Sequence, residues 1–94
     1  MLAINGESVF QINQGVSVRN IKNKAYFMLD ARTGTQYDLT EMEYLILTKI
    51  AGRMSLCEIA ADLRRTYNAH EQEIEEDLKD YAAQLLDNGL ISIL

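Results

Sequence analysis

The sequence predicts an α+β fold in which a three-stranded antiparallel sheet is followed by three helices. Two observations support this prediction. Between residues 16 and 39, short apolar segments alternate with turn residues, which is typical of strands. Between residues 41 and 88, apolar residues recur at spacings of three and four, which is typical of amphipathic helices. Strands that come first and helices that follow favour a sheet with its helices on one face.

The predicted strands cover residues 16–21, 25–30 and 35–39. The second and third form a hairpin, because Gly34 in their loop can adopt the positive φ that a tight loop needs. Residues 22–24 predict a turn between the first two strands. Residues 1–14 precede this meander, and residues 8–13 are expected to form an extra short strand or an arm laid on the sheet. The short apolar C-terminus, residues 90–94, is expected to fold back onto the domain.

Three helix starts carry a capping-box pattern, in which Thr, Ser or Asn is followed three residues later by Glu. The pattern begins at Thr40, Ser55 and Asn68, and predicts helices to about residues 51, 67 and 88. We expect Gly52 and Gly89 to follow the first and third helices as C′ residues. The apolar stripes are Met42, Leu45, Ile46 and Ile50 in the first helix, Leu56, Ile59, Ala60 and Leu63 in the second, and Ile74, Leu78, Tyr81, Ala82 and Leu85 in the third.

Length and composition indicate one soluble domain spanning residues 1–94. Its 94 residues suffice for a single core, and no apolar run approaches the ~20 residues that cross a membrane. The N-terminus lacks the basic and apolar regions of a signal peptide, and the single cysteine excludes an internal disulfide. We therefore expect a cytoplasmic protein without a membrane partner.

The sequence offers little for catalysis, so we predict a protein that is not an enzyme and binds neither metal nor cofactor. His70 is the single histidine, and alone it makes neither a catalytic triad nor a metal site. Cys57 falls in the first turn of the second helix, where the helix dipole favours a thiolate. Because no second cysteine exists, a buried or half-buried structural thiol is the preferred interpretation.

Acidic residues gather on the third helix, where residues 71–87 hold seven acids and a single base, Lys79. One interpretation is a solvated face whose first acids complement the helix macrodipole. The other is a face that attracts a basic peptide. A winged helix-turn-helix that reads DNA would need a basic recognition helix, so this charge and the net charge of −5 argue against a nucleic-acid partner.

The strand 35–39 ends the predicted meander, and it contains neither the proline nor the lysine that usually protects an edge strand. An open edge beside an amphipathic helix can accept an extended peptide as an added strand. The alternative is that residues 8–13 or the C-terminal tail already cover this edge.

An ordered set of short motifs, which spans residues 15–94, resembles the PqqD-like family of peptide-recognition domains. The motifs are Gly15-Val16 with Val18-Arg19, Leu29-Asp30 with Thr33-Gly34, Tyr37 and Leu39, Ser55-Leu56 with Glu58-Ile59, Leu63 and Tyr67, and Asp77 with Leu85 and Gly89-Leu90-Ile91. Departures include Thr40 where the family often has Asn, and Ala51-Gly52 where an Asp-Gly pair is common.

The resemblance implies a three-stranded sheet with three helices that binds the leader segment of a ribosomally made precursor peptide. The leader would add a strand to residues 35–39 in a groove with the third helix, and be presented to a modifying enzyme, often a radical-SAM maturase. Asp77 and Tyr81 are the expected exposed contacts. Function as a winged-helix-type regulatory or protein-interaction module stays open, as does the choice between monomer and homodimer. The implied peptide-binding residues are Thr35, Gln36, Tyr37, Asp38, Leu39, Ile74, Asp77, Leu78, Tyr81, Gln84 and Leu85.

Overall fold

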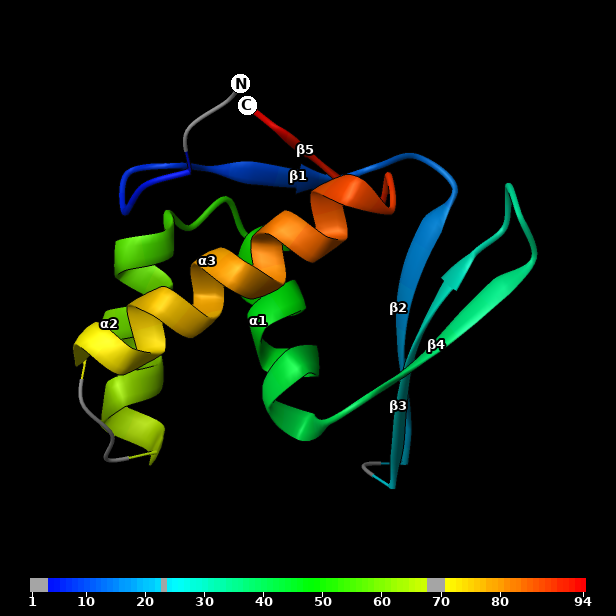
Figure 1. The fold of residues 1–94 in the computed structure, drawn as a ribbon. Helices are drawn as coiled ribbons and strands as arrows, with labels where there is room; N and C mark the ends of the chain where they lie inside the picture. Colours follow the sequence, from blue (N-terminus) through cyan, green and yellow to red (C-terminus); the bar gives the residue numbers. More distant parts are fainter. Residues whose placement is uncertain (1–3, 23, 68–70) are drawn as a thin grey trace.

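The computed structural model describes residues 4–22, 24–67 and 71–94. It confirms the predicted fold class: strands β2, β3 and β4 form an antiparallel sheet in that order, and three helices follow (Figure 1). The elements are β1 (Phe10–Ile12), β2 (Val16–Ile21), β3 (Ala25–Asp30), β4 (Thr35–Leu39), α1 (Glu41–Ala51), α2 (Leu56–Tyr67), α3 (Glu71–Asp87) and β5 (Ile91–Ile93).

The N-terminal segment is a strand, but it does not lie on the main sheet. β1 pairs antiparallel with β5, so that Phe10 faces Ile93 and Ile12 faces Ile91 in a separate two-stranded sheet. Figure 1 shows this pair across one end of the helices, away from the free end of the β2–β3 hairpin. The expectation of an arm on the sheet was therefore wrong, whereas the C-terminus does fold back.

The sheet turns one face toward the helices. Met28 of β3 is 1% exposed and lies between Val18 of β2 and Tyr37 of β4 in the ladder. Because side chains alternate along a strand, Phe27 and Leu29 lie on the opposite face. The buried apolar side chains form one cluster, to which all three helices, β1, β3 and β5 contribute.

Helix α1 lies at the centre of the molecule and contacts all four preceding strands as well as α2. Its predicted apolar stripe was partly wrong, because Leu47 is fully buried and Met42 is 38% exposed. A helix with neighbours on several sides buries more than one stripe, so periodicity alone does not identify its inner residues.

Both described capping boxes form as predicted. The Thr40 hydroxyl accepts from the Glu43 backbone N–H at 3.1 Å, while the Glu43 carboxylate accepts from the Thr40 N–H at 2.8 Å. Ser55 and Glu58 make the equivalent pair of bonds at 3.3 and 3.0 Å. Hydrogen bonds from the Ser55 N–H and hydroxyl lower the pKa of Glu58. The third predicted cap, at Asn68, lies outside the described residues.

The ends of α1 and α3 share one capping motif but place different residues at C′. After α3, Gly89 has φ of +70°, and Leu90 N–H donates to Leu85 C=O at 2.9 Å. After α1, Gly52 has φ of −80°, and it is Arg53 that adopts the left-handed conformation, with φ of +64°. The prediction that Gly52 is the C′ residue was therefore wrong by one position.

No helix in the described part of the chain is both long enough and apolar enough to span a bilayer.

Substitution by alanine should affect stability differently at Gly89 and at Gly52. Gly89→Ala should lower the free energy of unfolding by about 1 kcal/mol, because a Cβ is disfavoured at positive φ even though open space surrounds it. Gly52→Ala is the matched control and should not destabilise, because its φ is ordinary and its Cβ would make only normal contacts. Urea unfolding of both variants measures the difference, and equal midpoints would contradict the assignment of Gly89 as the strained position.

Candidate functional site: the groove between β4 and α3

β4 is an edge strand. In the described residues it pairs with β3 alone, because β1 and β5 pair with each other. Of the two alternatives that the sequence left open, coverage of this edge by residues 8–13 or by the C-terminal tail is wrong. Thr35, Gln36 and Asp38 are exposed, and Tyr37 and Leu39 are half-buried on the face that turns toward the helices.

A cavity of about 150 Å³ lies between this strand and α3, and we call it the β4–α3 groove. The main contacts of α3 are with α2 and β5, and those of β4 are with β3 and α1. The groove lies between these two sets of packed elements. The sheet, α1, α3 and the segment after α3 all contribute to its lining, which consists of Met28, Tyr37, Asp38, Leu39, Glu43, Tyr81, Gln84, Leu85, Asn88 and Leu90.

Six of the predicted residues meet in the β4–α3 groove: Tyr37, Asp38, Leu39, Tyr81, Gln84 and Leu85. Thr35 and Gln36 are not among its lining residues, although they belong to the same strand. The Gln36 side chain instead donates to the Asp38 carboxylate at 3.4 Å on the surface.

The remaining predicted residues, Ile74, Asp77 and Leu78, line a second cavity of about 300 Å³, which we call the α1–α3 pocket. Glu43 and Tyr81 line both cavities, so the pocket continues the groove past the end of β4. The full lining of the pocket is Met42, Glu43, Ile46, Leu63, Glu73, Ile74, Asp77, Leu78 and Tyr81.

Sequence reasoning missed the contribution of α1 to both cavities. Glu43 was recognised as a capping residue and Met42 as a core residue, and neither was assigned to the site. Their signal was present: the chain passes from β4 into α1 through Thr40 alone, so the first turn of α1 necessarily lies beside the end of the edge strand.

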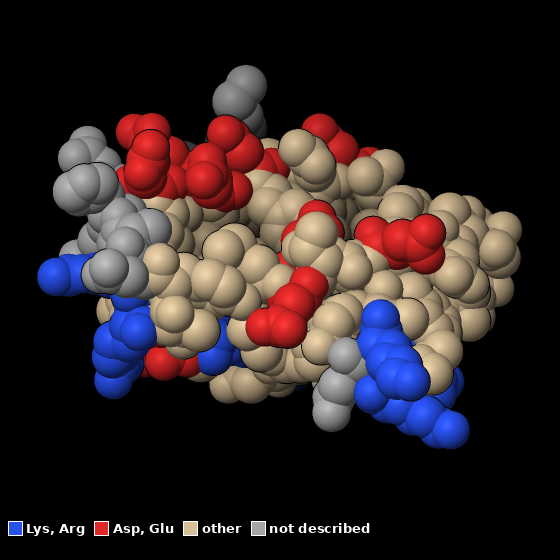
Figure 2. Space-filling model, turned by 90° about the horizontal axis from the view of Figure 1, so that it is seen from below, with Lys and Arg blue, Asp and Glu red and all other residues tan. Residues whose placement is uncertain are grey.

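The two cavities are acidic and apolar. Their linings include the carboxylates of Asp38, Glu43, Glu73 and Asp77, and no lysine or arginine among the described residues. On the face shown in Figure 2, acidic side chains spread over the upper and middle surface, while basic side chains gather in two groups toward its lower ends. The groove therefore presents negative potential to a ligand.

Tyr81 is partly buried between the two cavities, and packs against the core. Burial, with a smaller effect from the Glu43 carboxylate, raises the pKa of its hydroxyl well above the ordinary value of 10.0. The phenol is therefore protonated at physiological pH and available as a hydrogen-bond donor at the junction of groove and pocket.

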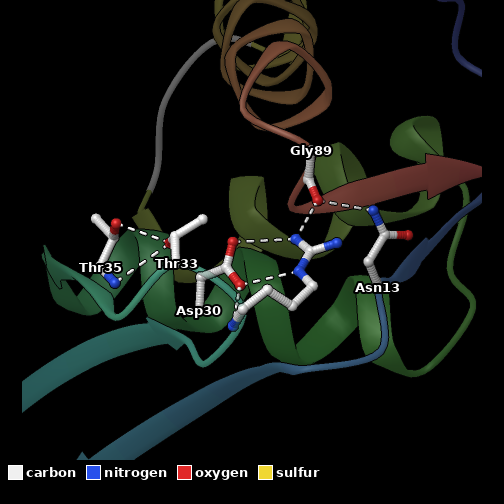
Figure 3. Close-up of polar contacts among 6 residues, drawn as sticks. Asn13, Asp30, Thr33, Thr35 and Gly89 are labelled. Carbon is white, nitrogen blue, oxygen red and sulfur yellow. Dashed lines mark hydrogen bonds and ion pairs between the residues drawn. The ribbon is translucent and has the colours of Figure 1, made fainter.

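An ion pair between a buried aspartate and a half-exposed arginine fixes the hairpin that carries β4. Asp30, at the end of β3, is 2% exposed, and Arg32 donates to its two carboxylate oxygens at 2.9 and 3.0 Å (Figure 3). The backbone N–H of Arg32 donates to the same carboxylate at 3.0 Å. These bonds, led by the guanidinium, lower the pKa of Asp30 and keep it charged.

The same arginine reaches the end of α3. Its Nη2 donates to the Gly89 carbonyl at 2.6 Å, and Asn13 donates to that carbonyl at 2.8 Å (Figure 3). Ser92 of β5 donates in turn to the Asn13 side chain at 2.5 Å. The β3–β4 hairpin and the C-terminal end of α3, which carry the two walls of the groove, are thus joined through one guanidinium.

Cys57 contradicts its predicted burial, since its side chain is exposed on the first turn of α2. The Gly6 carbonyl accepts from the Cys57 N–H at 2.8 Å, so the segment before β1 contacts the first turn of α2. His70 lies outside the described residues. Within the described ranges, no group of three His, Cys, Asp or Glu side chains is arranged to hold a metal ion.

Fold and site together define a small α+β domain. Its strand β4, which pairs on one side only among the described residues, borders an apolar groove with acidic groups. The sequence profile of the family described as Coenzyme PQQ synthesis protein D (PqqD) matches residues 25–91, more than half of the chain. The chain therefore belongs to the PqqD family, as its motifs predicted. No curated protein sequence matches it significantly.

Solved structures share the fold. A lasso peptide synthetase B1 complexed with the leader peptide has a TM-score of 0.80 and 23% identity, covering 88% of this chain and 96% of that one. TbiB1 in complex with the TbiA(beta) leader peptide has a TM-score of 0.79 and 22% identity, covering 87% and 94%. The PqqD truncation of Methylobacterium extorquens PqqCD, a functional stand-alone recognition element for ribosomally synthesised and post-translationally modified peptides, has a TM-score of 0.79 and 25% identity, covering 96% and 95%.

The Asp30–Arg32 ion pair predicts a pH-dependent contribution to stability. Since the folded pKa of Asp30 lies below its ordinary 3.8, the charged carboxylate stabilises the fold above pH 3.8, and this contribution is lost as pH falls through the folded pKa. Asp30→Asn should therefore lower the urea midpoint at pH 7, and its difference from wild type should shrink below pH 4. Asp80→Asn, at an exposed position, is the control and should leave the midpoint at pH 7 unchanged. A difference for Asp30→Asn that is as large at pH 2.5 as at pH 7 would contradict the assignment.

Proposed function

We propose that this protein binds the leader segment of a ribosomally synthesised precursor peptide as an added strand on β4, and presents it to a modifying enzyme. The observation that carries the proposal is the edge of β4 beside the β4–α3 groove, to which no other described strand pairs. Membership of the PqqD family supports it, and so do the two related folds that hold leader peptides.

The geometry suits strand addition in two ways. Main-chain N–H and C=O groups along β4 would pair with an extended peptide irrespective of its sequence. Alternate side chains of that peptide would then face the β4–α3 groove, where Tyr37, Leu39 and Tyr81 offer apolar contact and Gln84 a polar one. The site residues proposed for this contact are Thr35–Leu39 on the strand side, and Tyr81, Gln84 and Leu85 on the helix side.

The mechanism needs no catalytic residue in this chain. A leader held on β4 keeps the attached core peptide at high local concentration near the partner enzyme, which raises the rate of modification through effective concentration. The modifying enzyme would carry out the chemical step on the core peptide. By resemblance to the family, we expect that enzyme to be a radical-SAM maturase. We assign residues 1–94 to a single recognition domain, in which β1 and β5 close one end of the fold and leave β4 free.

An NMR titration tests the proposal. The labelled protein is titrated with the synthetic leader of the precursor peptide encoded beside its gene, and backbone amides are followed. Saturable shifts should concentrate on residues 35–39 and on the part of α3 that carries Tyr81 and Gln84. β2, the other edge of the same sheet, is an internal control. Shifts confined to β2 or to the β1–β5 pair would contradict binding at β4.

A bulky residue in the groove should block the peptide. Gln84→Trp, at an exposed lining position, should weaken leader binding at least tenfold, because the indole occupies space that the peptide needs. Glu76→Trp, exposed on the same helix and absent from both linings, should change the affinity less than twofold. Isothermal titration calorimetry measures both, and far-UV circular dichroism checks that each variant is folded.

A further inference from the structure

The α1–α3 pocket is not needed for strand addition, because it lies beyond the end of β4. It is nevertheless the larger of the two cavities, at about 300 Å³ against about 150 Å³. Its inner wall is formed by buried side chains of three helices, Ile46, Leu63 and Leu78, and Met42 stands exposed at its rim. An apolar hollow of this size accommodates a bulky apolar side chain, since a single water molecule occupies only ~30 Å³ of the liquid.

Three carboxylates line the same pocket. Glu43 lies on α1, and Glu73 and Asp77 lie one turn apart on α3, on the same side of that helix. Glu73 and Asp77 are exposed, and within the described residues neither forms an ion pair. Glu43 uses one oxygen to cap α1. A cation that approaches the pocket therefore meets carboxylates from two helices without displacing an existing partner.

The path of the peptide connects this pocket to the groove. A strand paired with β4 leaves the sheet where β4 ends at Leu39, next to the first turn of α1. Glu43 and Tyr81 belong to both linings at this point. Because the two cavities share these residues, a peptide that continues beyond Leu39 would next reach the pocket.

We propose that the α1–α3 pocket is a specificity subsite for the same peptide, which takes a bulky apolar side chain with a lysine or arginine one or two positions away. This inference rests on the proposed function. The apolar side chain fills the hollow floored by Ile46 and Leu78, and the basic group binds Glu73 and Asp77. The pocket would thereby select among leaders that β4 alone binds without preference for sequence.

A selection from random 15-residue peptides displayed on mRNA, carried out on the intact protein, tests the sequence preference. Recovered peptides should combine Leu, Ile, Met or Phe with a neighbouring Lys or Arg. The best binder is then synthesised with the basic residue as Lys and as Glu. The Lys form should bind roughly three- to tenfold more tightly, and the ratio should fall at high salt.

Two double variants that remove the same charge test whether the preference for a basic residue arises at the α1–α3 pocket. The double variant Glu73→Gln, Asp77→Asn should bind the Lys peptide roughly three- to tenfold more weakly than wild type does. Its affinity for the Glu peptide should not decrease. Glu76→Gln with Asp80→Asn removes the same charge from exposed positions of α3 outside both linings, and should change either affinity less than twofold. Equal effects of the two double variants would overturn the proposal, because attraction would then be a property of the whole acidic helix.

Met42→Ala tests the apolar part without touching the core, since Met42 is at the rim. It should weaken the full binder severalfold, and leave unchanged a truncated peptide that lacks the apolar and basic pair. Selected peptides could lack the apolar and basic pair of residues and still lose binding to the Gln84→Trp variant. That result would overturn the proposed subsite and leave strand addition on β4 intact. Binders that are indifferent to Gln84→Trp and shift no amide of β4 would contradict the proposed function itself.

Discussion

The buried carboxylate of Asp30 is the constraint on which the relative placement of the groove walls depends. A charge that is 2% exposed must be compensated, because its desolvation is expensive unless partners replace water. Arg32 donates to both oxygens of this carboxylate, and the Nη2 that makes one of these bonds also donates to the Gly89 carbonyl after α3. Such a pair adds modestly to stability, but it penalises any arrangement in which hairpin and helix separate. We infer that its main effect is to specify one geometry for the groove.

Because β1 and β5 pair with each other, neither of them covers the edge of β4. Both segments are short and apolar, and the sequence left open that one of them covers the edge of β4. They bury Phe10 and Ile91 in the core by pairing with each other, and Asn13 and Ser92 attach this pair to Gly89. The chain thus uses its spare strands to close one end of the fold, and β4 keeps an edge without the lysine or proline that would discourage pairing.

Local signals predicted what local interactions determine. The three strands of the main sheet, α1, α2, both described capping boxes and Gly89 as a helix stop follow from patterns within a few residues, and all are present. What the sequence did not reveal depends on contacts between distant residues. Asn13 meets Ser92 and Arg32 meets Gly89 only after folding, and Leu47 is buried because α1 has neighbours on several sides. The same distinction applies to the candidate site. The sequence predicted β4 and α3 as its walls. The contribution of Met42 and Glu43 could be seen only once the structure placed α1 beside the end of β4.

The groove combines two kinds of residue, which differ in how firmly the fold holds them, and this difference bears on the proposed binding of peptides. Glu43 caps α1, and Tyr81 packs on the core, so both are held in place before any ligand arrives. Walls fixed in this way reduce the ordering cost of binding. Asp77 and Gln84 are exposed, and substitutions at such positions usually change stability little. In the proposed function, affinity through the backbone of β4 and the rigid walls would therefore be set by the fold. The preference for particular side chains would be set at the rim, where residues can change without loss of the structure that supports them.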